Sequence, residues 1–274
     1  MTGQSPPNSR RRLILIERLS ENILPILVFI AALAIWEALV WVKAIPPYIL
    51  PAPSRIATTL LADWETLSAS LFVTLRITFA ALFAAMIGGV GLAIIFTQWK
   101  WAERSFFPFA VILQVTPIVA IAPLLLVYLD SSLAVLTCAF LVAFFPILSN
   151  TALGLASADR HLVDLFQLYR ASRWQELLWL RLPAALPYFL GGLRIGGGLA
   201  LIGAIVAEIA AGSAGQGAGL AFRIVESGYR LNIPRMFAAL FLISVTGIAI
   251  FLAFSFLSHL LLGRWHESAH KGER

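Results

Sequence analysis

The sequence predicts an all-α membrane protein with six transmembrane helices. Hydrophobic residues make up 60% of the 274 residues and charged residues only 12%, about half the charged fraction of an average soluble domain. The mean hydropathy is +0.88. The apolar residues gather in stretches of 20 residues or more, which suits helices that cross the hydrocarbon core and is about twice the length of a barrel strand.

Six such stretches follow one another along the chain. They are residues 23–42, 74–97, 106–129, 132–155, 189–211 and 236–262. The first is too long for the core of a signal peptide, and no small-residue cleavage pattern follows it. We therefore expect a retained first span, a polar segment over 1–22, a membrane domain over 23–262 and a polar tail over 263–274.

The lysine and arginine residues predict the orientation. Thirteen of the twenty lie in the segments that are cytoplasmic when the N-terminus is inside, and five lie in the segments that are then outside. This distribution follows the positive-inside rule and predicts a multi-pass protein of a bacterial cytoplasmic (inner) membrane with both termini cytoplasmic. Because the charges are spread over four loops, they do not form the basic face that a nucleic-acid partner requires.

The outer segment between the first two spans predicts an amphipathic helix. Ser54 is a plausible N-cap, and Ile56, Leu60, Trp64, Leu67 and Leu71 follow at spacings of three or four residues. We expect this helix to lie on the outer surface or against the bundle.

The inner segment 156–188 predicts two short helices. Ser157 is a candidate cap for the first, which runs to about Tyr169. Ser172 and Gln175 fit a capping box at the start of the second. Leu182-Pro183 is expected to end the second helix, because a residue before proline avoids helical geometry.

Composition leaves two interpretations of this helix pair open. The tryptophans and arginines fit an interfacial pair anchored at lipid headgroups, which is the simpler interpretation on composition alone. They also fit a surface on which a cytoplasmic partner docks.

Residues 164–187, "DLFQLYRASRWQELLWLRLPAALP", resemble the cytoplasmic signature of the permeases of ABC importers. That signature has Glu-Ala-Ala, three residues, Gly, nine residues and Ile-x-Leu-Pro. Asp164 falls on the Glu position, Arg170 on the glycine and Leu182-Pro183 on the final pair. The residues of this segment resemble those of the branch that serves nitrate, sulfonates, taurine and pyrimidine precursors. Further matches to this branch are "PPYILPAPSRI", "QVTPIVAIAPLLLVYL" and "GLRIGGGLALIGAIVAEI".

The resemblance implies a type I importer-like fold, with a coupling-helix pair between helices 4 and 5. It implies a membrane dimer, here expected to be a homodimer, that binds two ATPase subunits inside and a solute-binding protein outside. The ATPase-coupling residues that it implies are Asp164, Tyr169, Arg170, Ala171, Ser172, Arg173, Trp174, Leu182 and Pro183.

Two of these residues depart from the signature. Arg170 replaces a glycine where a left-handed backbone is often required, so either the turn is right-handed or the angle between the helices differs. Asp164 is one methylene shorter than Glu, which repositions any ion pair with a partner.

The chain has no phosphate-binding loop of its own. None of its three lysines, Lys43, Lys100 and Lys271, follows a glycine, so the Gly-x-x-x-x-Gly-Lys motif is absent. We therefore expect no cofactor in this chain and no enzyme activity, with ATP and Mg²⁺ held by the separate ATPase. His266 and His270 offer fewer ligands than a metal site requires.

Polar residues within the spans are the candidates for a translocation path. They are Arg76, Gln114, Thr116 and Glu208. Arg76 is equally well explained as a headgroup contact, and Glu208 as a structural bond to an outer loop. Gly192 and Gly196 form a GxxxG pair, expected to pack helices within the chain or across a homodimer.

Two other classes of protein remain. An ion-coupled carrier that works without an ATPase predicts clustered acids at mid-span and internal repeats, which the sequence lacks. A membrane anchor without a path leaves the prolines of the third span and the structured inner segment without a role. The sequence does not select the solute, which is a small anion or a pyrimidine-like compound by resemblance.

Overall fold

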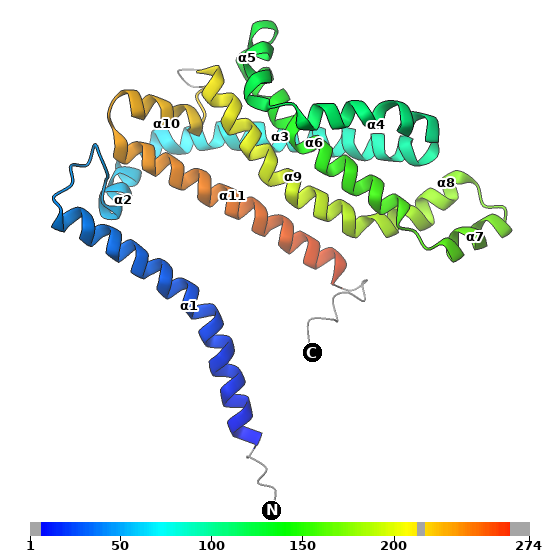
Figure 1. Ribbon diagram of the computed structural model, residues 1–274, viewed down its shortest axis with the longest axis horizontal. Helices are drawn as coiled ribbons and strands as arrows, with labels where there is room; N and C mark the ends of the chain where they lie inside the picture. The colour runs from blue at the N-terminus through cyan, green and yellow to red at the C-terminus, as the bar shows by residue number, and fades with distance from the viewer. Residues whose placement is uncertain (1–6, 213–216, 264–274) are drawn as a thin grey trace, which may run out of the picture.

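The computed structural model describes the backbone of residues 7–212 and 217–263 and the side chains from residue 23 onward. All regular secondary structure in these residues is helical (Figure 1). The elements are α1 Pro7–Val42, α2 Pro53–Ala62, α3 Trp64–Gln98, α4 Lys100–Val115, α5 Ile118–Tyr128, α6 Ser131–Ala156, α7 Arg160–Leu168, α8 Arg173–Glu176, η1 Leu177–Arg181, α9 Leu182–Ala211, α10 Leu220–Tyr229 and α11 Ile233–Leu262. His266, His270 and most of the predicted tail lie outside the described residues.

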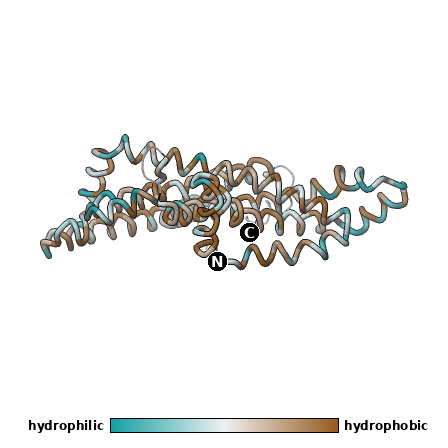
Figure 2. Tube along the Cα trace, turned by 90° about the horizontal axis from the view of Figure 1, so that it is seen from above, coloured by the Kyte–Doolittle hydropathy of each residue, from teal (hydrophilic) through white to brown (hydrophobic). Residues whose placement is uncertain are grey.

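The molecule is elongated, with α3, α6, α9 and α11 running along its length (Figure 1). The short helices α7 and α8 lie at one end, and α2 and α10 lie at the other. Hydrophilic residues concentrate at these two ends and hydrophobic residues cover the middle (Figure 2). This banding is the one that a bilayer requires of a multi-pass protein.

Within the described residues, five helices are long and apolar enough to cross a membrane, and the third predicted span is a broken one. Its two halves, α4 and α5, meet at an angle of 100°. Thr116 has extended backbone angles (φ −73°, ψ 124°), as expected for a residue before proline, and Pro117 supplies no N–H to continue the helix. The third predicted span therefore lies at the predicted place, but it consists of two helices with a bend between them.

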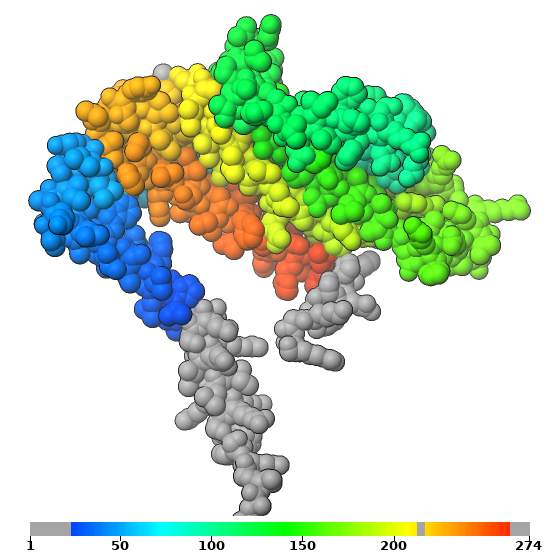
Figure 3. All heavy atoms as spheres, in the orientation of Figure 1, coloured from blue at the N-terminus to red at the C-terminus, as the bar shows by residue number. Residues whose placement is uncertain are grey.

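The predicted outer amphipathic helix is also divided. It ends at Ala62, and the remaining residues belong to α3. Ala52, not Ser54, is the N-cap of α2. The Ser54 N–H (3.0 Å) and hydroxyl (2.7 Å) instead donate to the carboxylate of Glu37, so that α1 is joined to α2 (Figure 3).

The centre of the molecule is the packing of α6 against α9, the most extensive helix pair, with α3 on α6. Three glycines allow the backbones of α6 and α9 to approach. A Cβ on Gly154 would lie 2.8 Å from Ala185 Cα, one on Gly192 would lie 2.9 Å from Asn150 Cβ, and one on Gly203 would lie 2.9 Å from Ala139 Cα. Lipid tails are as apolar as side chains, so close packing, rather than burial of apolar surface from water, holds such helices together.

An ionic network holds α10 and α11 at the α2–α10 end. The Arg223 guanidinium donates to Ser70 Oγ (2.9 Å) and to Glu226 (2.8 Å), and Arg230 pairs with the other oxygen of Glu226 (2.9 Å). The hydrogen bond from Arg223 lowers the pKa of Glu226. Arg235 pairs with Asp63, which joins α11 to the α2–α3 junction (3.3 Å).

The close approach of α6 and α9 can be tested with two adjacent glycines. We expect Gly192→Ala to destabilise the protein by about 1–3 kcal/mol, because its Cβ meets Asn150 and the Pro146 carbonyl. Gly191→Ala is the matched control, since nothing lies within 4 Å of its Cβ position, and it should be neutral or stabilising by up to about 1 kcal/mol. Thermal unfolding midpoints of the purified proteins compare them. Equal midpoints would contradict the packing described here.

Candidate functional site

Residues 156–188 contain one separate short helix, α7, and a second helical segment, α8, that continues through η1 into α9. The first helix also starts later than predicted. Ser157 ends α6, with its hydroxyl donating to the Gly154 carbonyl (2.8 Å). Asp159 is the N-cap of α7, where its carboxylate accepts from the His161 N–H (2.8 Å). An aspartate is as good an N-cap as a serine, and its position next to the first helical residue decides between them.

Arg170 adopts the left-handed backbone that the signature glycine would supply. Its φ is +55°. The Arg170 N–H bonds to the Gln167 carbonyl and the Ala171 N–H to the Phe166 carbonyl, both at 2.9 Å. These two bonds are the Schellman motif that ends a helix, with Arg170 at the position where glycine is usual. Of the two alternatives for this position, the right-handed turn is therefore wrong.

The second short helix begins with the predicted capping box. The Ser172 hydroxyl accepts from the Gln175 N–H (3.3 Å), and the Gln175 side chain accepts from the Ser172 N–H (2.7 Å). Two backbone donors are thereby satisfied at the N-terminus of α8. The direction of the chain after the turn at Arg170 is fixed by this reciprocal pair.

Leu182-Pro183 does not end the second helix, contrary to the prediction. The chain stays helical from Arg173 to Ala211, and Leu182 has helical angles (φ −65°, ψ −46°). A π-helical segment, η1, comes directly before the Leu182-Pro183 pair, and the Leu182 N–H donates to the carbonyl of Leu177, five residues earlier. The wider turn changes which carbonyl each N–H meets, so the missing N–H of Pro183 is accommodated without a break.

The α7–α8 pair exposes large apolar side chains at a hydrophilic end of the molecule. Leu168 is 81% exposed, Tyr169 80%, Trp174 57% and Trp179 76%. Between the two helices lies a hollow of about 510 Å³, lined by Leu165, Phe166, Tyr169, Arg170, Ala171, Gln175 and Trp179. Asp164 and Arg173 are also exposed. A contiguous exposed apolar patch with charged neighbours is typical of a surface that binds a partner.

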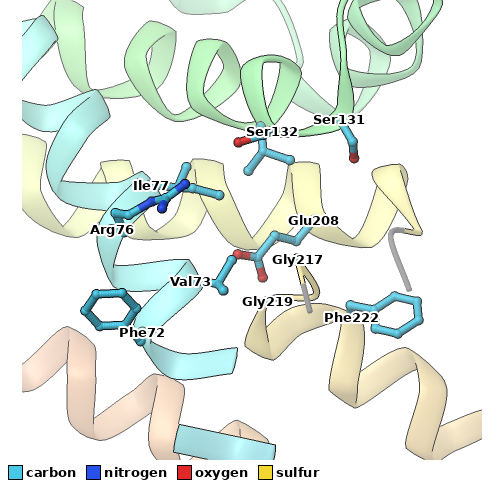
Figure 4. A pocket seen from close by; sticks show the side chains of 11 residues that line it. Phe72, Val73, Arg76, Ile77, Ser131, Ser132, Glu208, Gly217, Gly219 and Phe222 are labelled. Atoms are coloured by element: carbon cyan, nitrogen blue, oxygen red, sulfur yellow. The ribbon is translucent and has the colours of Figure 1, made fainter. Parts of the chain in front are cut away.

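A second site lies towards the other end, in a cavity of about 260 Å³ between α3, α6, α9 and α10 (Figure 4). Arg76 reaches it from α3, Ser132 from α6 and Glu208 from α9. Arg76 makes no ion pair with any residue in the described ranges. Phe72 and Phe222 complete a lining that combines one cation with two aromatic rings.

Glu208 is buried, with 5% of its surface exposed, and its carboxylate holds the start of α10. One oxygen accepts from the Thr74 hydroxyl (2.8 Å) and the other from the Ala221 N–H (3.1 Å). Thr74 in turn accepts from the Leu220 N–H (2.9 Å). Gly219 provides the space that the Glu208 carboxylate occupies, because a Cβ at this position would overlap that carboxylate. Glu208 thus makes a structural bond to the start of α10 and also borders the cavity.

The remaining path candidates lie elsewhere. Gln114 is exposed at the end of α4, and Thr116 is at the bend, where its hydroxyl donates to the Ile112 carbonyl (2.7 Å). Neither lines the cavity of Arg76 and Glu208. Sequence reasoning missed Thr74 and Gly219, and no local signal marks them, because Thr74 and Glu208 are 134 residues apart.

A bundle of long apolar helices with one bent span and an exposed helix pair at one end is the architecture of a multi-pass membrane protein. The model of the family "Binding-protein-dependent transport system inner membrane component" matches residues 85–266, and the chain belongs to this family. It is therefore a multi-pass membrane protein, a permease subunit of the ABC class rather than an enzyme.

The chain is similar over most of its length to several named permeases. It is 33% identical to the riboflavin transport system permease protein RibX of Chloroflexus aurantiacus, covering 86% of this chain and 87% of that protein. It is 33% identical to the formylaminopyrimidine transport permease protein ThiX of Halalkalibacterium halodurans (87% and 94%). It is 27% identical to the taurine transport system permease protein TauC of Escherichia coli (85% and 86%).

A solved structure has the same fold. The crystal structure of an amino acid ABC transporter with histidines matches with a TM-score of 0.60 at 16% sequence identity, covering 76% of this chain and 97% of that one.

The left-handed turn at Arg170 predicts a gain of stability on substitution. We expect Arg170→Gly to stabilise the α7–α8 pair by about 1 kcal/mol, because glycine adopts this conformation without a steric penalty. Arg170→Ala is the control, since it removes the side chain but keeps a Cβ. Amide hydrogen exchange over residues 160–180 should slow about fivefold in Arg170→Gly only. Equal slowing in both variants would assign the effect to the side chain instead.

The hydrogen bonds of Thr74 predict a contrast with Thr78, one turn further along α3. Both side chains are fully buried, but Thr78 Oγ1 has no partner among the described residues. Thr74→Val should cost about 1–3 kcal/mol, because it leaves the Leu220 N–H unsatisfied and removes a donor to Glu208. Thr78→Val should be neutral or stabilising. A larger loss in Thr78→Val than in Thr74→Val, in thermal unfolding, would contradict this assignment.

Proposed function

We propose that two copies of this chain form the membrane dimer of an ATP-driven importer, with the α7–α8 pair docked in a cleft of a separate ATPase subunit. In this arrangement the α7–α8 end and both termini face the cytoplasm, and a solute-binding protein delivers its cargo at the α2–α10 end. The observation that carries the proposal is the exposed hollow at a hydrophilic end, lined by apolar and polar side chains that include Tyr169, Arg170 and Gln175.

The proposed docking surface consists of the predicted coupling residues without Leu182 and Pro183. Asp164, Tyr169, Arg173 and Trp174 offer exposed side chains, and Ala171 with Ser172 forms the turn between the helices. Arg170 supplies both the turn and part of the hollow. Leu182 and Pro183 belong to α9 instead. Their proposed role is to transmit a displacement of α8 to this membrane-spanning helix.

We assign the entry of the translocation path to the cavity of Arg76. Its guanidinium, which has no ion pair among the described residues, suits a small anion, and the rings of Phe72 and Phe222 suit a planar heterocycle. The relatives named for taurine, formylaminopyrimidine and riboflavin transport span both kinds of cargo. Gln114 and Thr116, at the bend between α4 and α5, are assigned to a later part of the path.

An ion-coupled carrier is the alternative, and the positions of the acids in the spans count against it. Glu37 and Glu208 both bond to the start of a short helix. Neither forms part of an acidic cluster within the described ranges. A carrier would require protonatable groups that are free to load and release an ion during the cycle.

Co-purification tests the proposal. Solubilised protein expressed together with its neighbouring genes should bring down an ATPase. Trp174→Ala combined with Arg173→Glu should weaken this capture about 30-fold, the effect of losing a buried interface tryptophan worth about 2 kcal/mol. The double variant should keep the parent's unfolding midpoint, because both side chains are exposed.

A matched control is available at the other end of the molecule. Trp64→Ala combined with Arg55→Glu removes an exposed tryptophan and reverses an exposed arginine of α3 and α2. This control should retain full ATPase capture. Absence of an ATPase from the parent preparation would contradict the importer proposal. If both double variants capture the ATPase equally well, only the docking assignment is wrong.

A further inference from the structure

The π-helical turn brings together two charged side chains that an α-helix would separate. Glu176 and Arg181 are five residues apart. Each residue of an α-helix turns about 100°, so residues five apart point about 140° away from each other. In a π turn the hydrogen bonds connect residues five apart, which places such residues above one another. The Arg181–Glu176 pair and η1 therefore depend on each other.

One guanidinium joins three elements at this point. The Arg181 Nε and Nη2 atoms each lie 2.6 Å from Glu176 Oε1 at the end of α8. Arg181 Nη1 donates to the Leu155 carbonyl in the last turn of α6 (3.2 Å). That carbonyl is among those left without a partner at the end of a helix. Because Arg181 directly precedes α9, its side chain connects α8, α6 and α9.

The residues next to the Arg181–Glu176 pair are closely packed. Leu177 is 1% exposed and belongs to the same buried cluster as Leu155, Ala185 and Phe96. Gly154 and Ala185 are close enough that a Cβ on the glycine would lie 2.8 Å from Ala185 Cα. Neither α7 nor α8 contains a buried residue. The buried part of this segment thus begins at Leu177 in η1, and the Arg181–Glu176 pair is what connects α8 to it.

We propose that Arg181 and Glu176 are positioning residues for transport, which fix α8 on α6 and α9 so that these helices move as one body. A displacement of the α7–α8 pair then shifts the two central helices instead of bending the chain at Leu177. This inference rests on the proposed docking of an ATPase at α7 and α8. The side chains of Arg181 and Glu176 are only 26% and 15% exposed, so their loss should leave ATPase binding intact and remove the response of the spans.

The response of the spans can be read in the cavity at the other end of the molecule. Ser132→Cys, in a background with Cys138→Ala, places one thiol in the cavity lining. The rate of its reaction with a membrane-impermeant maleimide is measured in the permease–ATPase complex, without nucleotide and with ATP and vanadate. In the parent we expect a change of at least fivefold between the two states.

Arg181→Met should abolish this change while the complex still assembles and hydrolyses ATP. Arg181→Lys can reach the carboxylate or the Leu155 carbonyl but not both, and Glu176→Gln keeps an acceptor but loses the charge. Both should reduce the change at least twofold without lowering the unfolding midpoint. Arg104→Met is the control, an exposed arginine of α4 without a contact in the described residues, and should respond like the parent.

The possible results separate the two proposals. No ATPase in the parent complex, or no nucleotide response in the parent, overturns the proposed function itself. A full response in Arg181→Met overturns the positioning role alone. If Arg181→Met does not assemble, the two milder variants decide: a reduced response at a normal unfolding midpoint supports the role, whereas a full response, or failure of both to fold, overturns it.

Discussion

The contact of the α6 and α9 backbones is the constraint on which the rest of the structure depends. In a hydrocarbon environment the burial of apolar surface gives no preference for one helix pair over another, so the preference comes from packing distance. Gly154, Gly192 and Gly203 supply that distance along the whole length of the pair. Helix α3 packs on α6, and the short helices of each end attach to the termini of these long ones.

Two spans attach their neighbouring short helix in the same way. Glu37 near the end of α1 accepts from the N–H of Ser54, and Glu208 near the end of α9 accepts from the N–H of Ala221. Ser54 and Ala221 are each the second residue of a short helix, α2 and α10. A carboxylate at that position satisfies a free donor and complements the helix dipole. Glu208, a path candidate in the sequence, and Glu37 therefore both help to fix the α2–α10 end.

The α7–α8 end combines a strained turn with a rigid base. Arg170 holds a left-handed conformation that costs an L-residue about 1–2 kcal/mol, which the Schellman bonds and the capping box of Ser172 offset. Behind this turn, the π segment and the Arg181–Glu176 pair join α8 to the bundle. The proposed docking surface is thus separated from the spans by only one helical turn.

The sequence by itself determined the features that depend on neighbours in the chain. The length of the apolar stretches predicted the positions of the spans, and the spacing of Ser172 and Gln175 predicted a helix cap. The spacing of the signature residues indicated the family. The tertiary structure decided what depends on residues far apart or on competing local rules. The bend at Pro117 and the passage of a helix through Pro183 have the same local signal, a proline in an apolar helix, and opposite outcomes. At Pro183 the π turn and the contact of Arg181 with Leu155 stabilise the continuous helix, whereas at Pro117 the chain turns by 100°. Rules based on neighbouring residues do not predict this difference, because the partner of Arg181, the Leu155 carbonyl, lies 26 residues away in the sequence.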